Sequence, residues 1–313
     1  MDIKNTSMIT EFVLLGLTST WELEIFFFLI FLLSYAAIMA GNRLIVVTVT
    51  FDFHLNSTPM YFLLGNLSFL DMTISTITTP KMITDFLREK KTISLWGCMV
   101  QMFFLHFLGG SEMTLLVVMA VDWYIAICKP LHYTTIMNHW VLVGSVLLSW
   151  GVGFVHTMSQ MVFTITLPFC GPNVVDNIFC DLPLVLKLVC TDTYILELLV
   201  IADSGLLSLI CFILLLISYT VILVTLRGRS SGGLSKALST LSAHITVVTL
   251  FLGACIFIYA WPFSCLSVDK FLSVFYSVIT PLLNPIIYTL RNQEMKAAMS
   301  RLRTQHVSSR QNL

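Results

Sequence analysis

Acidic side chains inside long apolar stretches are the residues of this sequence best suited to chemistry. Asp71, Glu112 and Asp203 each interrupt a run of mainly hydrophobic residues. A carboxylic acid in such surroundings is costly to bury, and it usually faces a partner, water or an ion. Asp203 requires a cation or a proton, and a protonated His106 or a basic ligand could supply it. These positions indicate polar sites inside an otherwise apolar protein.

Asp71 and Glu112 are expected at a similar depth, near the middle of the apolar layer. Asp71 lies about 18 Å along a helix that starts at Pro59, and Glu112 lies about 15 Å from Asp122. Two interpretations stay open. The acids are neutral, hydrogen-bonded groups that hold helices together, or they bind an ion.

The sequence has no arrangement typical of an enzyme. It contains no convincing nucleophile with its base, and no Cys or His pair has the short spacing of a zinc site. We therefore expect no catalytic residue, no cofactor and no structural metal.

The composition is that of a membrane protein. Of 313 residues, 57% are hydrophobic and 11% are charged, and the mean hydropathy is +0.89. These values leave too little polar surface for a water-soluble globule. The formal net charge is +0, which gives no reason to expect nucleic acid as a partner.

The apolar runs predict an all-α membrane protein, a bundle of seven transmembrane helices in one domain. Each run is long enough to cross a bilayer as a helix. We expect an extracellular segment over 1–24, the bundle over 25–290, and a cytoplasmic tail with a short amphipathic helix over 291–313. The expected spans are 25–50, 59–80, 97–128, 140–165, 196–226, 238–262 and 271–290.

The orientation follows from three weak signals that agree. With the N-terminus outside, the inner segments carry a small excess of Lys and Arg. Asn5 then begins an extracellular Asn-Thr-Ser glycosylation acceptor. Several cysteines also gather outside, where disulfides persist. We expect a multi-pass protein of the plasma membrane with a cytoplasmic C-terminus.

Four cysteines at the outer ends of the expected helices allow three disulfide connectivities. They are Cys98, Cys170, Cys180 and Cys190. Cys265 would lie on the same side and makes the outer count odd, so we expect a free thiol. The other three are expected to pack as small hydrophobes, and they are Cys128, Cys211 and Cys255.

Several helix faces in the outer half of the bundle combine apolar and a few polar side chains. A cavity with such a lining suits a small, partly apolar ligand, although ordinary packing between helices remains an alternative. Met113 shares the face of the third span, where Gly109 and Gly110 leave room. The candidate ligand contacts are Met102, Leu105, His106, Gly109, Asp203, Ser204, Leu207, Ile256, Tyr259, Ser273, Val274 and Ser277.

Five segments resemble signatures of one family, in the same order and spacing. Residues 119–128 (MAVDWYIAIC) are similar to M-A-x-D-R-Y-x-A-I-C, and residues 54–63 (HLNSTPMYFL) are similar to L-H-x-P-M-Y. Residues 218–219 (SY), 236–244 (KALSTLSAH) and 281–288 (PLLNPIIY) complete the set. The chain thus resembles the olfactory receptors of tetrapod type (class II), within the rhodopsin-like G-protein-coupled receptors.

The resemblance implies a function and partners. It implies an odorant receptor that binds a small volatile molecule within the bundle and raises cAMP through a stimulatory, olfactory-type G protein. It also implies disulfides Cys98–Cys180 and Cys170–Cys190. It favours a sodium or proton site at Asp71 and Glu112 with Asn42 and Asn284 nearby. The residues implied in coupling or switching are Asp122, Trp123, Tyr124, Tyr219, Lys236, His244, Pro285 and Tyr288.

The sequence departs from the family at Trp123, which stands where the family carries arginine. An indole cannot replace a fixed charge with five hydrogen-bond donors, so weakened coupling to the G protein is expected. Leu252 also stands where an aromatic residue is usual. A receptor that binds ligand but signals poorly is one alternative function. A transporter or channel that uses Asp71, Glu112 and Asp203 is another, although no repeated halves are visible.

Overall fold

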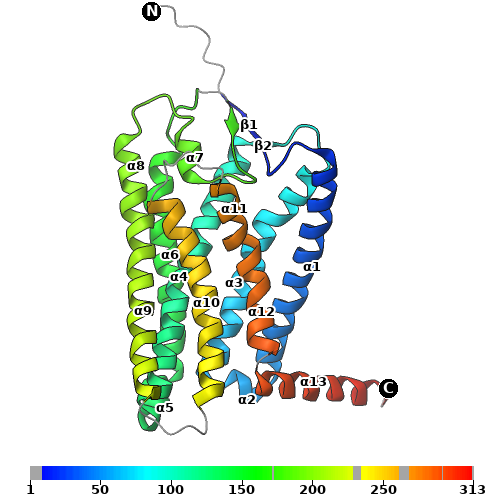
Figure 1. Ribbon diagram of the computed structural model, residues 1–313, viewed down its shortest axis with the longest axis vertical. Helices are drawn as coiled ribbons and strands as arrows, with labels where there is room; N and C mark the ends of the chain where they lie inside the picture. Colours follow the sequence, from blue (N-terminus) through cyan, green and yellow to red (C-terminus); the bar gives the residue numbers. More distant parts are fainter. Residues whose placement is uncertain (1–8, 171–172, 228–233, 261–267, 291, 312–313) are drawn as a thin grey trace, which may run out of the picture.

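A computed structural model describes residues 9–170, 173–227, 234–260, 268–290 and 292–311 of the chain. Long helices run side by side from one end of the molecule to the other, with short strands and loops at one end (Figure 1). The principal helices are α1 (Trp21–Phe51), α3 (Pro59–Asp85), α4 (Leu95–Cys128), α6 (His139–Thr164), α9 (Leu206–Arg227), α10 (Leu234–Ala260) and α12 (Thr280–Leu290).

The seven-helix membrane bundle predicted from the sequence is confirmed. In the described part of the chain, six spans are long and apolar enough to cross a membrane, and a shorter apolar segment covers Val248–Tyr259 within α10. The fifth span joins α8 (Tyr194–Val200), a π-helical turn η2 (Ile201–Gly205) and α9. The last joins α11 (Val268–Val274), a second π-helical turn η3 (Phe275–Ile279) and α12.

The first helix begins earlier than the apolar run indicates. It starts at Trp21, inside the 1–24 segment expected to precede the bundle. Glu22 and Glu24 lie in its first turn, where negative charge is favourable beside the partly positive helix end. Helix formation therefore continues into polar residues that hydropathy alone places outside.

A small sheet at the outer end was not predicted. Its strands are β1 (Glu11–Leu14), β2 (Thr92–Ser94) and β3 (Val174–Val175), in the order β2-β1-β3. Strand β1 is antiparallel to β2 and parallel to β3. It alternates in burial, with Phe12 and Leu14 turned inward. The segment before α1 therefore packs against the outer loops.

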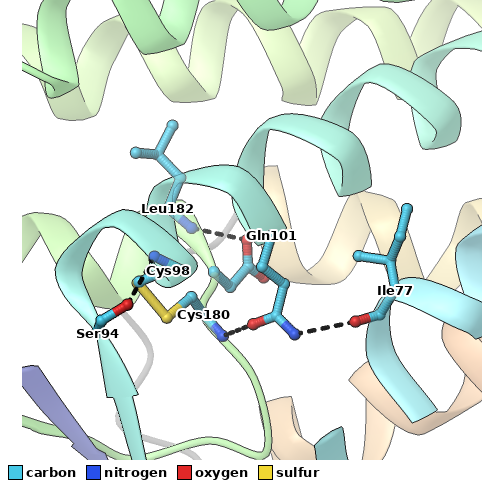
Figure 2. Close-up of a disulfide and its surroundings, with 8 residues drawn as sticks. Ile77, Ser94, Cys98, Gln101, Cys180 and Leu182 are labelled. Carbon is cyan, nitrogen blue, oxygen red and sulfur yellow. Dashed lines mark hydrogen bonds between the residues drawn. A yellow bond between two sulfur atoms is a disulfide. The ribbon is translucent and has the colours of Figure 1, made fainter. Parts of the chain in front are cut away.

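Four cysteines at the end of the bundle that carries the sheet form two disulfides. Cys98 on α4 is joined to Cys180 with Cα atoms 5.5 Å apart, and Cys170 is joined to Cys190 at 5.6 Å. Beside the first disulfide, the Cys180 N–H donates to Gln101 Oε1 at 3.0 Å (Figure 2). Gln101 Nε2 donates to the Ile77 carbonyl of α3 at 3.3 Å. The disulfide and this amide hold the long outer loop over the bundle.

The closest packing of two long helices lies between α4 and α6. A Cβ atom at Gly153 would collide with the Phe107 carbonyl and the Ser111 hydroxyl of α4. A Cβ at Gly110 would lie 3.2 Å from His156 Cδ2. Glycine at both positions thus brings the two helices together and makes room for the His156 ring.

The C-terminal helix α13 (Gln293–Gln311) crosses the end of the bundle opposite the sheet (Figure 1). It buries Met295 and Ala298 completely. Arg301 Nη2 donates to Asp52 Oδ2 at 2.7 Å, and Asp52 caps the short helix α2 (Phe53–Asn56). Both an apolar face and an ion pair therefore dock the helix.

Candidate ligand-binding site and cytoplasmic switch

A narrow cavity lies in the outer half of the bundle. Most of its lining is apolar, and the polar groups are two imidazoles, two phenols, one hydroxyl and one thiol. The lining residues are Ile74, Leu105, His106, Gly109, Gly110, Met113, His156, Ser204, Leu207, Phe251, Cys255, Tyr259 and Tyr276.

Half of the predicted ligand contacts line this cavity. The six are Leu105, His106, Gly109, Ser204, Leu207 and Tyr259. Met102, Asp203, Ile256, Ser273, Val274 and Ser277 are not among the lining residues. On the last span, Tyr276 in the π-helical turn η3 lines the cavity, whereas the two serines bond elsewhere. Ser277 Oγ donates to the Ser273 carbonyl at 2.6 Å, and Asn177 Nδ2 donates to Ser273 Oγ at 3.5 Å.

Sequence reasoning missed five lining residues. They are Ile74, His156, Phe251, Cys255 and Tyr276. His156 had a signal, since a histidine inside an apolar run needs a polar partner. The apolar residues had none, because packing residues and ligand contacts have the same composition.

The partner of Asp203 is His156, and the expectation that His106 would serve is wrong. His156 Nδ1 lies 3.2 Å from Asp203 Oδ2. Ser159 donates to the same oxygen, as does Gln160 Nε2 at 3.2 Å. Gln160 Nε2 also donates to Ser204 Oγ at 2.6 Å. The π-helical turn η2 contains both Asp203 and Ser204.

His106 instead lies beside an acid of the outer loop. Its Nε2 is 3.5 Å from Asp181 Oδ1, and Tyr259 donates its hydroxyl proton to the same oxygen at 3.2 Å. Asp181 follows the disulfide cysteine Cys180 and also accepts from the Leu182 N–H at 2.8 Å (Figure 2). The loop therefore brings an acid to the cavity wall.

Asp71 and Glu112 are both buried in the middle of the bundle. Asn284 Nδ2 donates to Asp71 Oδ2 at 2.8 Å. Four other buried oxygens nearby in the structure have no hydrogen-bond partner within the described residues: Asp71 Oδ1, both Glu112 carboxylate oxygens and Asn284 Oδ1. No group of three or more His, Cys, Asp or Glu side chains suited to a metal occurs there either.

Asn42 was expected beside Asp71 and Glu112, but its side chain bonds to backbone carbonyls instead. Its Nδ2 donates to the Pro281 carbonyl at 3.0 Å and to the Ile38 carbonyl at 3.1 Å, and no bond joins it to Asp71. Pro285 has no N–H to donate to the Pro281 carbonyl four residues earlier. Asn42 therefore satisfies the backbone group that the proline of α12 leaves free.

At the end of the bundle opposite the sheet, Asp122 is buried and pairs with a tyrosine. Tyr133 on α5 (Tyr133–Ile136) donates its hydroxyl proton to Asp122 Oδ1 at 2.9 Å. Burial and the neighbouring carboxylate raise the pKa of Tyr133 above its ordinary value. Trp123 is half-buried against the core, as is Tyr124, and Tyr219 is buried.

Some predicted positions lie outside the described residues. Asn5 and Cys265 fall in segments that are not described. Lys236 and His244 lie on α10 and Tyr288 lies on α12, but their side chains are likewise outside the description.

The whole chain matches one protein family. A family model for the olfactory receptors matches residues 31–306. The chain belongs to the olfactory receptor family. Human olfactory receptor 4L1 is 67% identical over 312 residues and covers all of both chains. Olfactory receptor 4K13 is 66% identical over 301 residues, 96% of this chain and 99% of its own. Human olfactory receptor 4K3 is 62% identical over 306 residues, and the match covers 98% of this chain and 97% of that receptor.

Family membership fits the architecture of this receptor. It is a multi-pass membrane protein of a receptor family that is not enzymatic. The cavity, the two acids in the middle of the bundle and the Asp122 pair follow one another from the end with the sheet to the opposite end.

Proposed function

We propose that this receptor binds a small volatile odorant in the outer cavity and signals through a stimulatory, olfactory-type G protein that raises cAMP. The observation that carries the proposal is the lining of the cavity, which comes from α3, α4, α6, η2, α9, α10 and η3. A ligand there contacts most of the bundle at once. It can favour one arrangement of the helices over another and so shift the population of receptor states.

The proposed orientation places the sheet, both disulfides and Asn5 outside the cell. Disulfides persist in an oxidising compartment, and both lie at the same end of the bundle as the sheet. The opposite end, with Asp122, Tyr133 and α13, then faces the cytoplasm and the G protein.

Asp71, Glu112 and Asn284 are proposed as a site for sodium or a proton that favours the inactive state. The unpaired oxygens in the middle of the bundle support this proposal, because a buried oxygen without a donor is costly. Sodium accepts such oxygens as ligands, and a proton on one acid lets it donate to the other.

Trp123 favours a second form of the function, in which ligand binds but coupling is weak. Arginine at this position could pair with Asp122 and contact the G protein, whereas indole carries no charge. Tyr133 donates to Asp122 instead. Asp122 therefore has a partner without an arginine, but the charge that would meet the G protein is missing.

The test is a cAMP screen of the surface-expressed receptor against a broad panel of volatile molecules, with Trp123→Arg in parallel. We expect Trp123→Arg to raise ligand-driven cAMP at least about fivefold, the lower end of typical coupling free energies. Trp140→Arg, at an exposed tryptophan near the start of α6, is the matched control and should not raise it. Equal signalling by Trp123→Arg and the unmodified receptor would contradict the role given to Trp123.

A further inference from the structure

Two imidazoles line the cavity, and each has an acid beside it. His156 Nδ1 lies 3.2 Å from Asp203 Oδ2, and His106 Nε2 lies 3.5 Å from Asp181 Oδ1. The two ring centroids are 6.0 Å apart. The histidines come from neighbouring helices, and the acids come from the π-helical turn η2 and the outer loop. Two Asp-His pairs therefore meet at one cavity.

The acids stand behind the imidazoles and do not line the cavity. Asp203 is fixed by donors from Ser159 and Gln160 of α6. Asp181 is fixed by the Tyr259 hydroxyl and the Leu182 N–H. A bound molecule consequently meets imidazole nitrogens first, and it does not reach a carboxylate.

The position of each acid assigns the tautomer of its imidazole. A neutral imidazole carries one N–H, and the neighbouring carboxylate favours that proton on the nitrogen facing it, although neither of these two nitrogens makes a hydrogen bond within the described residues. His156 Nε2 and His106 Nδ1 are then left to accept from a bound molecule. A carboxylate behind an imidazole also makes the opposite nitrogen a better proton acceptor, as in the Ser-His-Asp arrangement.

A hydroxyl donor completes the arrangement on the cavity side. Ser204 Oγ accepts from Gln160 Nε2 at 2.6 Å, which leaves its own proton to donate. A ligand hydroxyl can therefore donate to an imidazole and accept from Ser204. The rest of the lining, with Leu105, Met113, Leu207 and Phe251, suits an apolar skeleton.

We propose that this receptor selects small, mainly apolar molecules that carry an O–H donor: alcohols, phenols and undissociated carboxylic acids. Aldehydes, ketones and ethers offer only an acceptor and leave the imidazole nitrogens desolvated without a donor. Sites built to bond a hydroxyl discriminate strongly against analogues that lack it, here by at least about tenfold. This inference rests on the proposed function, since it takes the cavity as the odorant site.

The experiment measures ligand-dependent thermal stabilisation of the purified full-length receptor in lipid nanodiscs, so that the readout does not need a G protein. The probes are alcohols, carboxylic acids, aldehydes and methyl ethers on matched linear, branched, cyclic and aromatic skeletons. On every skeleton that binds, we expect the alcohol or acid to reach half of its maximal effect at a concentration at least about tenfold lower than that of the aldehyde or ether.

Two variants test the assignment to the imidazole. His156→Phe should reduce the preference for O–H ligands, because only the His106 imidazole then remains to accept, while the skeleton preference stays. His139→Phe, at an exposed histidine on the same helix, should leave the preference unchanged. If His156→Phe fails to fold, Asp203→Asn serves, because it removes the charge that fixes the tautomer. It should reduce the preference and change which ligands the receptor recognises.

Two results would overturn the inference, and they differ in what they say of the cavity. Aldehydes or ethers that stabilise the receptor as well as alcohols do, or a preference that neither His156→Phe nor Asp203→Asn reduces, would refute the ligand class and leave the odorant function standing. If no probe stabilises the receptor and none raises cAMP in the signalling screen, the proposed function fails as well.

Discussion

Acids lie behind the wall of the outer cavity and in the middle of the bundle, but the protein provides the two sets with different numbers of hydrogen-bond donors. Asp181 and Asp203 each lie beside an imidazole and accept from further donors. Asp71 has one donor, Asn284, and Glu112 has none within the described residues. Acids with partners nearby can orient a neighbour toward a ligand. Acids without them need an ion or a proton, and they respond to whichever is present.

The outer pairs and the middle acids therefore serve different functions in the same bundle. The outer acids receive donors from the protein itself, so they can orient the imidazoles that accept from a ligand. The middle acids have too few hydrogen-bond donors within the described residues, so their free energy depends on whether an ion or a proton binds between the helices. Ligand specificity belongs to the first region, and the balance between receptor states belongs to the second.

The largest expected effect comes from a substitution that pushes α4 and α6 apart beside the outer cavity. Gly153→Ala places a methyl group against the Phe107 carbonyl and the Ser111 hydroxyl. Overpacking of this kind costs about 1–3 kcal/mol, so thermal stability and surface expression should fall. Gly151→Ala, two residues away with open space around it, is the matched control and should behave as the unmodified receptor. Equal thermal midpoints for the two variants would show that the close contact at Gly153 does not limit stability.

A smaller effect should distinguish the middle acids from the outer ones. Replacing potassium with sodium should stabilise the receptor by about 1 kcal/mol when sodium reaches about five times its dissociation constant. Asp71→Asn or Glu112→Gln should abolish this gain and shift basal cAMP, whereas Asp203→Asn should keep it. The measurement is the thermal midpoint in the two salts, together with basal cAMP. Unchanged signalling in both middle variants would count against the ion or proton site.

The smallest effect concerns a charge pair that solvent reaches. Burial raises the pKa of Asp52, but the Arg301 guanidinium and backbone N–H groups outweigh it and hold that pKa below its ordinary value. The stability that the pair contributes is therefore present above about pH 4 and is lost as the pH falls through the lowered pKa of Asp52. Because half of the Arg301 side chain is exposed, Arg301→Gln should cost at most about 1 kcal/mol near pH 7.

Thermal midpoints across pH check this prediction. The difference between Arg301→Gln and the unmodified receptor should shrink as the medium becomes acidic below about pH 4. Lys296→Gln, at an exposed lysine of the same helix, should show no such pH dependence. A difference that grows on acidification would refute the ion pair as its cause.

The site was only partly predictable from the sequence. Asp203 and His106 were both recognisable as polar residues in apolar runs, but their partners were not. The true pairs join residues 47 and 75 positions apart, His156 with Asp203 and His106 with Asp181. The π-helical turns η2 and η3 contain the cavity residues Ser204 and Tyr276, whereas Ser273, which precedes η3, does not line the cavity. No pattern in the sequence marks such a turn.

The sequence by itself determined the membrane class, the seven spans and the family, because apolar runs of fixed length and the signature segments are local properties of the chain. It also supplied every acid and imidazole discussed above. Only the tertiary structure decided which of them meet, that Asn42 serves the Pro281 carbonyl, and that Gly153 brings α4 against α6. The physical reason is that helical spacing fixes neighbours within one helix, whereas neighbours on different helices depend on how the helices are packed and rotated.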